Sequence, residues 1–231
     1  MCGRYRLSRI DRLLAAYQEI FGGKFEEFSE IHITPRFNIA PSQNAPIIRT
    51  AKDGSAKLQL ARWGLVPSWI KGKPKSAPIN AKAETIDTSG MFHQAFAHRR
   101  CLVPADGFYE WQGAKPPRRP FFIHKGDDSL FFFAGLWERW RESESAEPLD
   151  TFTIITTKPN SLIEKIHDRM PVILKPENYS AWLDKTSPPD AIKAMLKPCP
   201  DAELDAYPVS PAVNSPKNEG PELTKPDAEP G

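Results

Sequence analysis

The high proline content is the feature that most restricts how this chain folds. Proline accounts for 24 of the 231 residues, which is about twice the average share. Because proline lacks a backbone N–H and clashes with the preceding helical turn, this content excludes long uninterrupted helices. Hydrophobic residues still make up 40% of the chain, which excludes a wholly disordered protein and is enough for a sizeable core. The chain must therefore fold from short elements.

Short apolar runs between turn signals predict mainly β-strands. Strands are expected at 45–49, 57–63, 101–103, 108–111, 121–124, 130–137, 151–157 and 172–174, with Asp53-Gly54 as a hairpin turn between the first two. Helices are expected from Ser8 to Gly22-Gly23, over 89–98, from an Asn160 cap to Ile166, and over 179–184 and 190–196. Strands outnumber helices and do not alternate regularly with them, which favours an α+β fold with largely antiparallel sheets.

Charge is unevenly distributed although the total is nearly balanced. Lys plus Arg is 31 and Asp plus Glu is 29, which gives a net charge of +2. Residues 62–125 hold 11 basic and 4 acidic residues, or +7, whereas residues 198–231 hold 2 and 7, or −5. Trp63, Trp69 and Trp111 are interleaved with the basic segment, and such a combination neutralises phosphates and stacks on unpaired bases. The alternative is a solvated face with ordinary core tryptophans.

Several classes of protein are disfavoured. No run of 18 apolar residues is present, so no transmembrane helix is expected, and the N-terminus MCGRYRLSR lacks the apolar stretch of a signal peptide. Cys2, Cys101 and Cys199 form neither a disulfide framework nor a CxxC signature. His93 and His98 with Cys101 lack a second pair to complete a tetrahedral metal site. We therefore expect a reduced, cytosolic protein without metal, cofactor or membrane partner.

Cys2 is the first candidate for chemistry. Removal of Met1, which is common before a small second residue, leaves a thiol and a free α-amine on the same residue. The α-amine has an ordinary pKa of roughly 7.7–8.0 and the thiol one of about 8.5, so both are reactive near neutral pH. Such a pair suits attack on an aldehyde, because the amine forms a Schiff base and the thiol then closes a five-membered thiazolidine ring. The alternative is an ordinary cysteine at a frayed terminus.

Glu110, His167 and Asn80 are the other candidates. Glu110 alternates with aromatic residues in segment 104–111, where burial would raise its pKa and suit it to proton transfer; otherwise it is a surface glutamate. His167 follows an apolar helical stretch and can exchange protons near neutrality, or else it stabilises a helix end. Asn80 is suited either to orienting a substrate or to a turn or cap.

These candidates fall within a series of short motifs, namely MCGRY (1–5), RFNIAPSQ (36–43), WGLVPSW (63–69), INAKAET (79–85), MF (91–92), CLVPADGFYEW (101–111), IHDRMPVIL (166–174), and PVS with VN (208–214). In this order and spacing, the chain resembles the SOS response-associated peptidase (SRAP) family, whose members crosslink abasic sites in DNA. The resemblance runs from Met1 to about Leu223. It implies an α+β fold around a barrel-like, mostly antiparallel sheet with short peripheral helices. We expect a single domain over 1–225 and a disordered tail over 226–231.

The resemblance also implies a function and a set of site residues. Cys2, freed from Met1, would attack the ring-opened aldehyde of an abasic site in single-stranded DNA, and the thiazolidine crosslink would shield the lesion. Asn80 and Glu110 would line this lyase-like site, Glu110 would relay protons, and His167 would protonate the sugar oxygen. DNA contacts are expected from Arg4, Asn38, Pro41, Trp69, Lys82 and Arg169.

Three positions depart from the family pattern, and two other functions stay open. Lys82 stands where members often have Arg, Ile70 where some have a second Trp, and Gly90 where an Arg is frequent; these changes bear on DNA affinity. The alternative function is a cysteine-type peptidase with Cys2 as nucleophile, Glu110 or His167 as base and Asn80 in an oxyanion site. A third is a nucleic-acid-binding module without chemistry. We expect a monomer that, in a bacterium, is cytoplasmic and joins the nucleoid and replication-fork proteins after damage.

Overall fold

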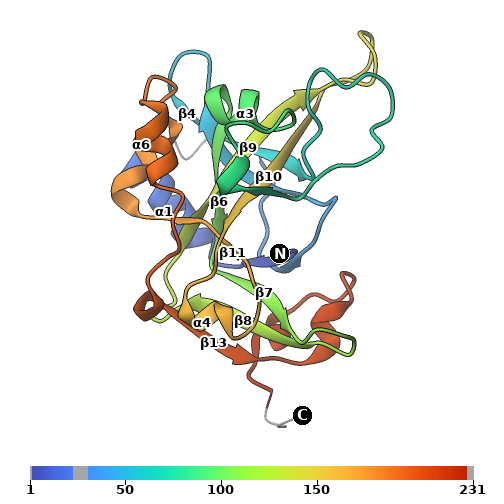
Figure 1. The fold of residues 1–231 in the computed structure, drawn as a ribbon, viewed down its shortest axis with the longest axis vertical. Helices are drawn as coiled ribbons and strands as arrows, with labels where there is room; N and C mark the ends of the chain where they lie inside the picture. The colour runs from blue at the N-terminus through green and yellow to red at the C-terminus, as the bar shows by residue number, and fades with distance from the viewer. Residues whose placement is uncertain (1, 23–30, 228–231) are drawn as a thin grey trace.

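The computed structural model describes residues 2–22 and 31–227. Within them, two β-sheets lie one above the other along the long axis of the molecule, with helices α1, α3 and α6 beside the upper sheet (Figure 1). The strands are β1 (Arg4–Leu7), β2 (Arg36–Ile39), β3 (Asn44–Thr50), β4 (Ala56–Trp63), β5 (Asn80–Lys82), β6 (Arg100–Ala105), β7 (Gly107–Gln112), β8 (Arg119–Lys125), β9 (Phe131–Trp140), β10 (Leu149–Thr157), β11 (Met170–Pro171), β12 (Ile173–Leu174) and β13 (Leu204–Pro208). The α-helices are α1 (Ile10–Phe21), α3 (His93–His98), α4 (Ser161–Glu164), α5 (Tyr179–Leu183) and α6 (Pro189–Ala194), and the 3-10 helices are η1 (Ala83–Thr85), η2 (Pro176–Asn178), η3 (Asp201–Glu203), η4 (Pro211–Asn214) and η5 (Pro221–Thr224).

The upper sheet closes into a barrel. β10 pairs with β9 and β4, β9 pairs with β6, β6 with β3, and β3 with β4, so these five strands form a ring. The pairings of β10 with β4 and β5 are parallel, and the other pairings in both sheets of the described chain are antiparallel. Trp63 and Phe152 stack inside the core with ring centroids 6.2 Å apart, and Tyr5 packs edge-on against Trp63. The α+β, barrel-like fold implied by the sequence is therefore confirmed.

The lower sheet holds the N-terminal strand in its interior. Its strand order is β13-β8-β7-β1-β2, and only Asp106 separates β7 from β6 of the barrel. Asp106 is fully buried and accepts hydrogen bonds from the Arg6 side chain and from the backbone N–H groups of Ser8 and Arg9. These bonds fix the end of β1, an interior strand of the lower sheet, to the bend that joins the two sheets.

Most of the predicted elements are present with small shifts at their ends. The hairpin between β3 and β4 turns at Gly54, where φ is +88°, and α1 ends at Gly22 in the left-handed conformation; Gly23 lies outside the described residues. Asn160 caps α4 as expected, since its Oδ1 accepts the Ile163 N–H at 2.9 Å. The predicted start of the first helix is wrong: α1 begins at Ile10, because Ser8 instead bonds Asp106.

Other differences lie in polar or proline-rich segments. Of the strand expected at 172–174, only Ile173–Leu174 forms a strand, β12, and the short β11 lies just before the expected range. Helix α4 ends at Glu164, two residues before the predicted end. Pro226 bridges to Val209, and the Asp227 N–H donates to Pro208 O at 2.8 Å. The first two residues of the expected tail, 226 and 227, are therefore paired with the rest of the chain, and 228–231 lie outside the described residues. In the described parts, no helix has the length and apolar character needed to cross a membrane.

Candidate active site

Cys2 lies just before β1 and is completely buried. Its Sγ is 3.8 Å from the carbonyl oxygen of Arg4, which accepts a weak thiol hydrogen bond. Burial, assisted by the nearby charge of Glu110, raises the pKa of the thiol far above its ordinary value. β1 pairs with β7 in the register Arg4↔Tyr109, and because the strands are antiparallel, Glu110 lies level with the residue before Arg4. The strand pairing thus brings Glu110 beside the start of the chain.

Asn80 reaches the same place from the barrel. It begins β5, which runs parallel to β10 with Asn80 opposite Ile154. Its Nδ2 donates to the backbone carbonyl oxygen of Cys2 at 2.9 Å. Its Oδ1 is also buried, and within residues 2–22 and 31–227 it has no hydrogen-bond partner. An unpaired buried amide oxygen is costly, so this atom is suited to accept a hydrogen bond from a substrate.

Glu110 and His167 are the candidate acid–base pair of this site. Glu110 is 1% exposed, and burial raises its pKa to about 7. His167 Nε2 lies 4.0 Å from Glu110 Oε2, and burial lowers the pKa of His167. Near neutral pH, the carboxyl group therefore exists in both protonation states next to a largely neutral imidazole, an arrangement suited to moving protons in either direction.

The other ring nitrogen of His167, Nδ1, has two polar neighbours. Nδ1 is 2.9 Å from Asp168 Oδ1 and 3.0 Å from the backbone nitrogen of Arg169. When Nδ1 accepts the Arg169 N–H, the neutral ring carries its hydrogen on Nε2, facing Glu110; a protonated ring donates from Nδ1 to Asp168. A cavity of about 510 Å³ opens beside this ring, lined in part by Trp111, Arg118 and Lys165.

The six residues expected to contact DNA differ in exposure. Trp69 is 61% exposed, Lys82 is exposed, and Pro41 is half-buried. The Arg4 guanidinium instead donates to Asn38 Oδ1 at 2.9 Å and to the carbonyl oxygens of 213 and 214. Asn38 is fully buried, and its Nδ2 donates to carbonyl oxygens of 213, 215 and 218. These two side chains hold the C-terminal segment in this structure.

Arg169 is also engaged, by a residue that the sequence did not single out. Its guanidinium forms a two-pronged ion pair with Glu84, at 2.7 and 2.8 Å. Glu84 and Asp168 both lie inside motifs read from the sequence, INAKAET and IHDRMP, next to recognised candidates. Their place in these motifs could have marked Glu84 and Asp168 as candidates. Their contacts could not be predicted, because these depend on how β5, β10 and β11 pair.

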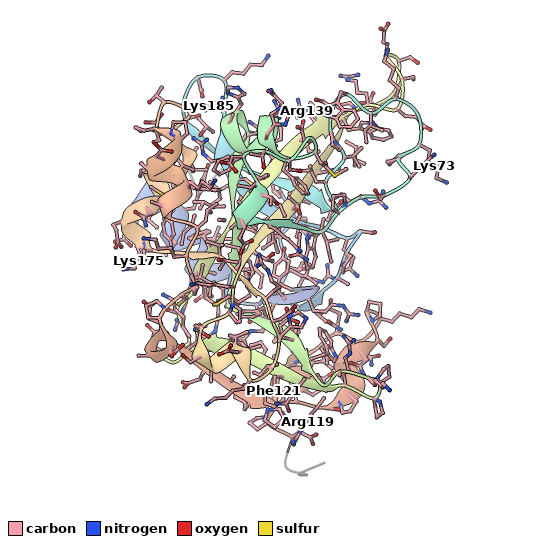
Figure 2. The ribbon with its side chains drawn as sticks, viewed as in Figure 1. Lys73, Arg119, Phe121, Arg139, Lys175 and Lys185 are labelled. Atoms are coloured by element: carbon pink, nitrogen blue, oxygen red, sulfur yellow. The ribbon has the colours of Figure 1, made fainter. Side chains whose placement is uncertain are left out.

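The basic segment 62–125 does not form one continuous surface. Lys73 lies on the loop at the outer edge of the upper half of the molecule, whereas Arg119 lies at the bottom beside Phe121 on β8 (Figure 2). Arg100 is buried, and its guanidinium donates to backbone carbonyl groups, including Phe96 O and Trp182 O. A nucleic-acid surface is therefore better sought close to Cys2 than along the whole segment.

Comparison with known proteins gives consistent matches along the chain. Residues 1–216 match the family model described as SOS response associated peptidase (SRAP). The abasic site processing protein YoqW of Bacillus subtilis is 45% identical over 228 residues, covering 96% of this chain and 98% of the relative. The abasic site processing protein YedK of Escherichia coli is 31% identical over 234 residues, covering 98% of this chain and all of the relative.

Solved structures of similar fold are also found. A protein from Bacteroides thetaiotaomicron superposes with a TM-score of 0.84 at 26% identity, covering 98% of this chain and all of that one. A phage-related protein from Bordetella bronchiseptica superposes with a TM-score of 0.68 at 30% identity, covering 90% of this chain and 94% of that one.

Proposed function

Because the chain belongs to the SOS response-associated peptidase family, we propose that it senses abasic sites in single-stranded DNA and links them covalently to Cys2. Relatives across nearly the full length carry the name abasic site processing protein. The observation that carries the proposal is the convergence of Asn80, Glu110 and His167 on the residue that begins the chain once Met1 is removed.

The reaction uses both reactive groups of Cys2. The α-amine adds to the aldehyde carbon of the ring-opened abasic sugar, giving a carbinolamine that loses water to form an imine. The thiol sulfur then adds to the imine carbon, and the thiol proton passes to the nitrogen, which closes a thiazolidine ring. The adduct therefore has the mass of protein plus DNA minus one water. No oxidant, metal or other co-reactant enters this balance.

Glu110 is the group suited to the proton transfers at the nitrogen and at the departing hydroxyl. The amine must lose a proton as it attacks, and the carbinolamine hydroxyl must gain one before it leaves as water. With a pKa of about 7, Glu110 accepts the first proton and donates the second at cellular pH, whereas an ordinary glutamate stays ionised. A single carboxyl group between amine and hydroxyl can serve both steps.

His167 is assigned to the sugar oxygen. Its Nε2 faces the same space as Glu110, and the cavity beside it has room for part of a nucleotide. The protonated imidazole can donate a proton to the ring oxygen while the sugar opens to the aldehyde, and the neutral imidazole can remove that proton when the sugar closes again. The same residue therefore assists formation of the crosslink and its reversal.

The peptidase alternative has less support. A thiol peptidase needs a thiolate, which an adjacent cation or base stabilises, whereas burial raises the pKa of the Cys2 thiol. One of the two hydrogens on Asn80 Nδ2 is used on the carbonyl oxygen of Cys2 itself, so a single hydrogen is left for an oxyanion. A protonated thiol that attacks an imine needs neither feature, because the imine nitrogen accepts its proton.

Intact-mass spectrometry tests the proposal. Purified protein is expected to begin at Cys2, and incubation with an abasic single-stranded oligonucleotide is expected to add the mass of the strand minus one water. The controls are the same strand without the lesion and the Cys2→Ala variant, neither of which should form the adduct. Active protein that mainly retains Met1, or an adduct that keeps the water, would refute the mechanism.

A further inference from the structure

The ion pair between Glu84 and Arg169 lies at the edge of the site. Arg169 Nη1 is 2.7 Å from Glu84 Oε1, and Nη2 is 2.8 Å from Oε2. Two parallel charge-assisted bonds of this kind fix orientation as well as distance. The Arg169 side chain is only 15% exposed, whereas that of Glu84 is 49% exposed, so the guanidinium is well shielded from water and the carboxylate holds it from the solvent side.

The pair connects the two strands that flank the end of β10. Thr156 of β10 lies opposite Lys82 of β5 on one side and Pro171 of β11 on the other. Glu84 lies in η1, which directly follows β5, and Arg169 directly precedes β11. Arg169 Nη2 also donates to the carbonyl oxygen of Thr156 at 2.6 Å. The ion pair therefore ties the β5 and β11 segments together across β10.

Both of the tied segments carry reactive-site residues. Asn80 begins β5 and holds the carbonyl oxygen of Cys2. His167 precedes Arg169 by two residues, and the Arg169 N–H donates to its Nδ1 at 3.0 Å. When Nδ1 accepts this N–H rather than donating to Asp168 Oδ1, which lies 2.9 Å away, the neutral ring carries its hydrogen on Nε2, toward Glu110. The position of the Arg169 backbone therefore helps to decide which nitrogen of His167 presents a proton to the site.

We infer that Glu84 is a positioning residue that, through Arg169, sets the orientation and tautomer of His167. Glu84 itself does not contact the groups that react. The catalytic consequence rests on the proposed function, but the effect on the imidazole does not. A second consequence separates this role from DNA binding: both Nη atoms of Arg169 are occupied by Glu84, so removing Glu84 would free Arg169 for a phosphate.

The first test measures the ring nitrogens of His167 in DNA-free protein by ¹⁵N NMR, with the signals assigned through the His167→Gln variant. At about pH 8, above the ordinary pKa of histidine, the wild-type ring is expected as the Nε2–H tautomer. Glu84→Ala is expected to give a mixture of tautomers, and Glu84→Gln a smaller change, because its Oε1 can still accept one of the two hydrogen bonds from Arg169. The matched control is Asp87→Asn, which breaks the nearby exposed pair with Lys193 and should leave the His167 signals unchanged.

The second test measures crosslinking to an abasic single strand at saturating DNA. Glu84→Ala is expected to slow adduct formation about tenfold, since misplacing a reacting group by about 1 Å costs up to roughly 10²-fold. Affinity for an undamaged strand should not fall, and Asp87→Asn should react at the wild-type rate. Thermal unfolding shows whether Glu84→Ala is still folded. If it is not, the crosslinking rate of Glu84→Gln is compared with that of wild type instead.

Each outcome bears on the inference. Unchanged His167 signals in both Glu84 variants would overturn it, as would a slowed rate with unchanged signals, because Glu84 would then act by another route. Tighter binding of undamaged DNA by Glu84→Ala without a slower crosslinking rate would also overturn the inference. Glu84 would then act by competing with DNA phosphates for Arg169. If wild-type protein formed no adduct, the proposed function would fail, while the NMR measurement would still decide the role of Glu84.

Discussion

Replacing Glu110 by Gln is expected to stabilise the folded protein while slowing its reaction. Glu110 is 1% exposed, and burial raises its pKa from 4.5 to about 7. Between these two values, the folded protein keeps a proton that the unfolded chain releases. Folding stability therefore falls as pH rises from about 4.5 to about 7 and stays level above that range. Gln cannot ionise, so the variant avoids this loss.

The magnitude follows from the shift. A difference of about 2.5 pKa units, at 1.36 kcal/mol per unit, corresponds to roughly 3 kcal/mol of stability above pH 7. Glu110→Gln is therefore expected to gain up to about 3 kcal/mol relative to wild type near pH 8 and almost nothing near pH 4.5. General acid–base help is worth about 10²–10⁴-fold, so crosslinking should slow by a factor in that range.

Urea unfolding at several pH values between 4.5 and 8, followed by tryptophan fluorescence, measures the first effect. Glu177→Gln, in the exposed part of η2, is the matched control and should follow the wild-type curve. Single-turnover crosslinking measures the second effect. If the unfolding free energies of Glu110→Gln and wild type ran parallel from pH 4.5 to 8, the raised pKa would be refuted. If the rate were unchanged, the proton relay would be refuted.

Cys2→Ala is expected to abolish a heat-stable adduct and Cys2→Ser to leave at most a labile imine, because a hydroxyl closes the ring far less readily than a thiol; a full-strength adduct of Cys2→Ala on a denaturing gel would contradict this. His167→Ala is expected to slow adduct formation modestly and release more, as timed by moving a preformed adduct into excess trapping protein; release at the wild-type rate would leave His167 only a structural role. Trp69, which is 61% exposed, is expected to contribute roughly 1–3 kcal/mol to binding of undamaged single strands by stacking. That binding should also weaken with salt, with a slope of about −0.7 per phosphate contact. Affinity unchanged by Trp69→Ala would place the DNA surface elsewhere.

The strands of the barrel ring and strands β7 and β8 of the lower sheet were predictable from the sequence, whereas β1, β2 and β13 of the lower sheet were not. β9 and β10 are long runs rich in apolar, aromatic or β-branched residues, because both of their faces are mostly buried. β1 reads RYRL and β2 reads RFNI, and their arginines suggest exposed loops. In the folded protein, Arg6 pairs with Asp106 and Arg4 with carbonyl groups more than 200 residues away. Partners so distant in sequence leave no local pattern from which to predict a strand.

The site shows the same division between local chemistry and long-range contacts. Cys2, Glu110 and His167 could be singled out because each residue type carries a reactivity that its motif makes plausible. The raised pKa of Glu110 could also be anticipated from its aromatic neighbours, since burial is the main cause. Glu84 could not be assigned, because an exposed glutamate acquires a role only when β5 and β11 meet on either side of β10.

The anchoring of β1 bears on how the end of a chain could serve as the reactive centre of the proposed reaction. Terminal residues usually fray, which would scatter an attached amine over many positions. Here β1 is an interior strand, paired with β7 on one side and β2 on the other. Tyr5 is fully buried against Trp63, and Asp106 holds the backbone N–H groups of Ser8 and Arg9. Cys2 lies two residues before this fixed strand, with its carbonyl oxygen held by Asn80. In the proposed reaction, the amine and thiol would therefore be positioned before a substrate arrives, and little entropy would remain to be lost.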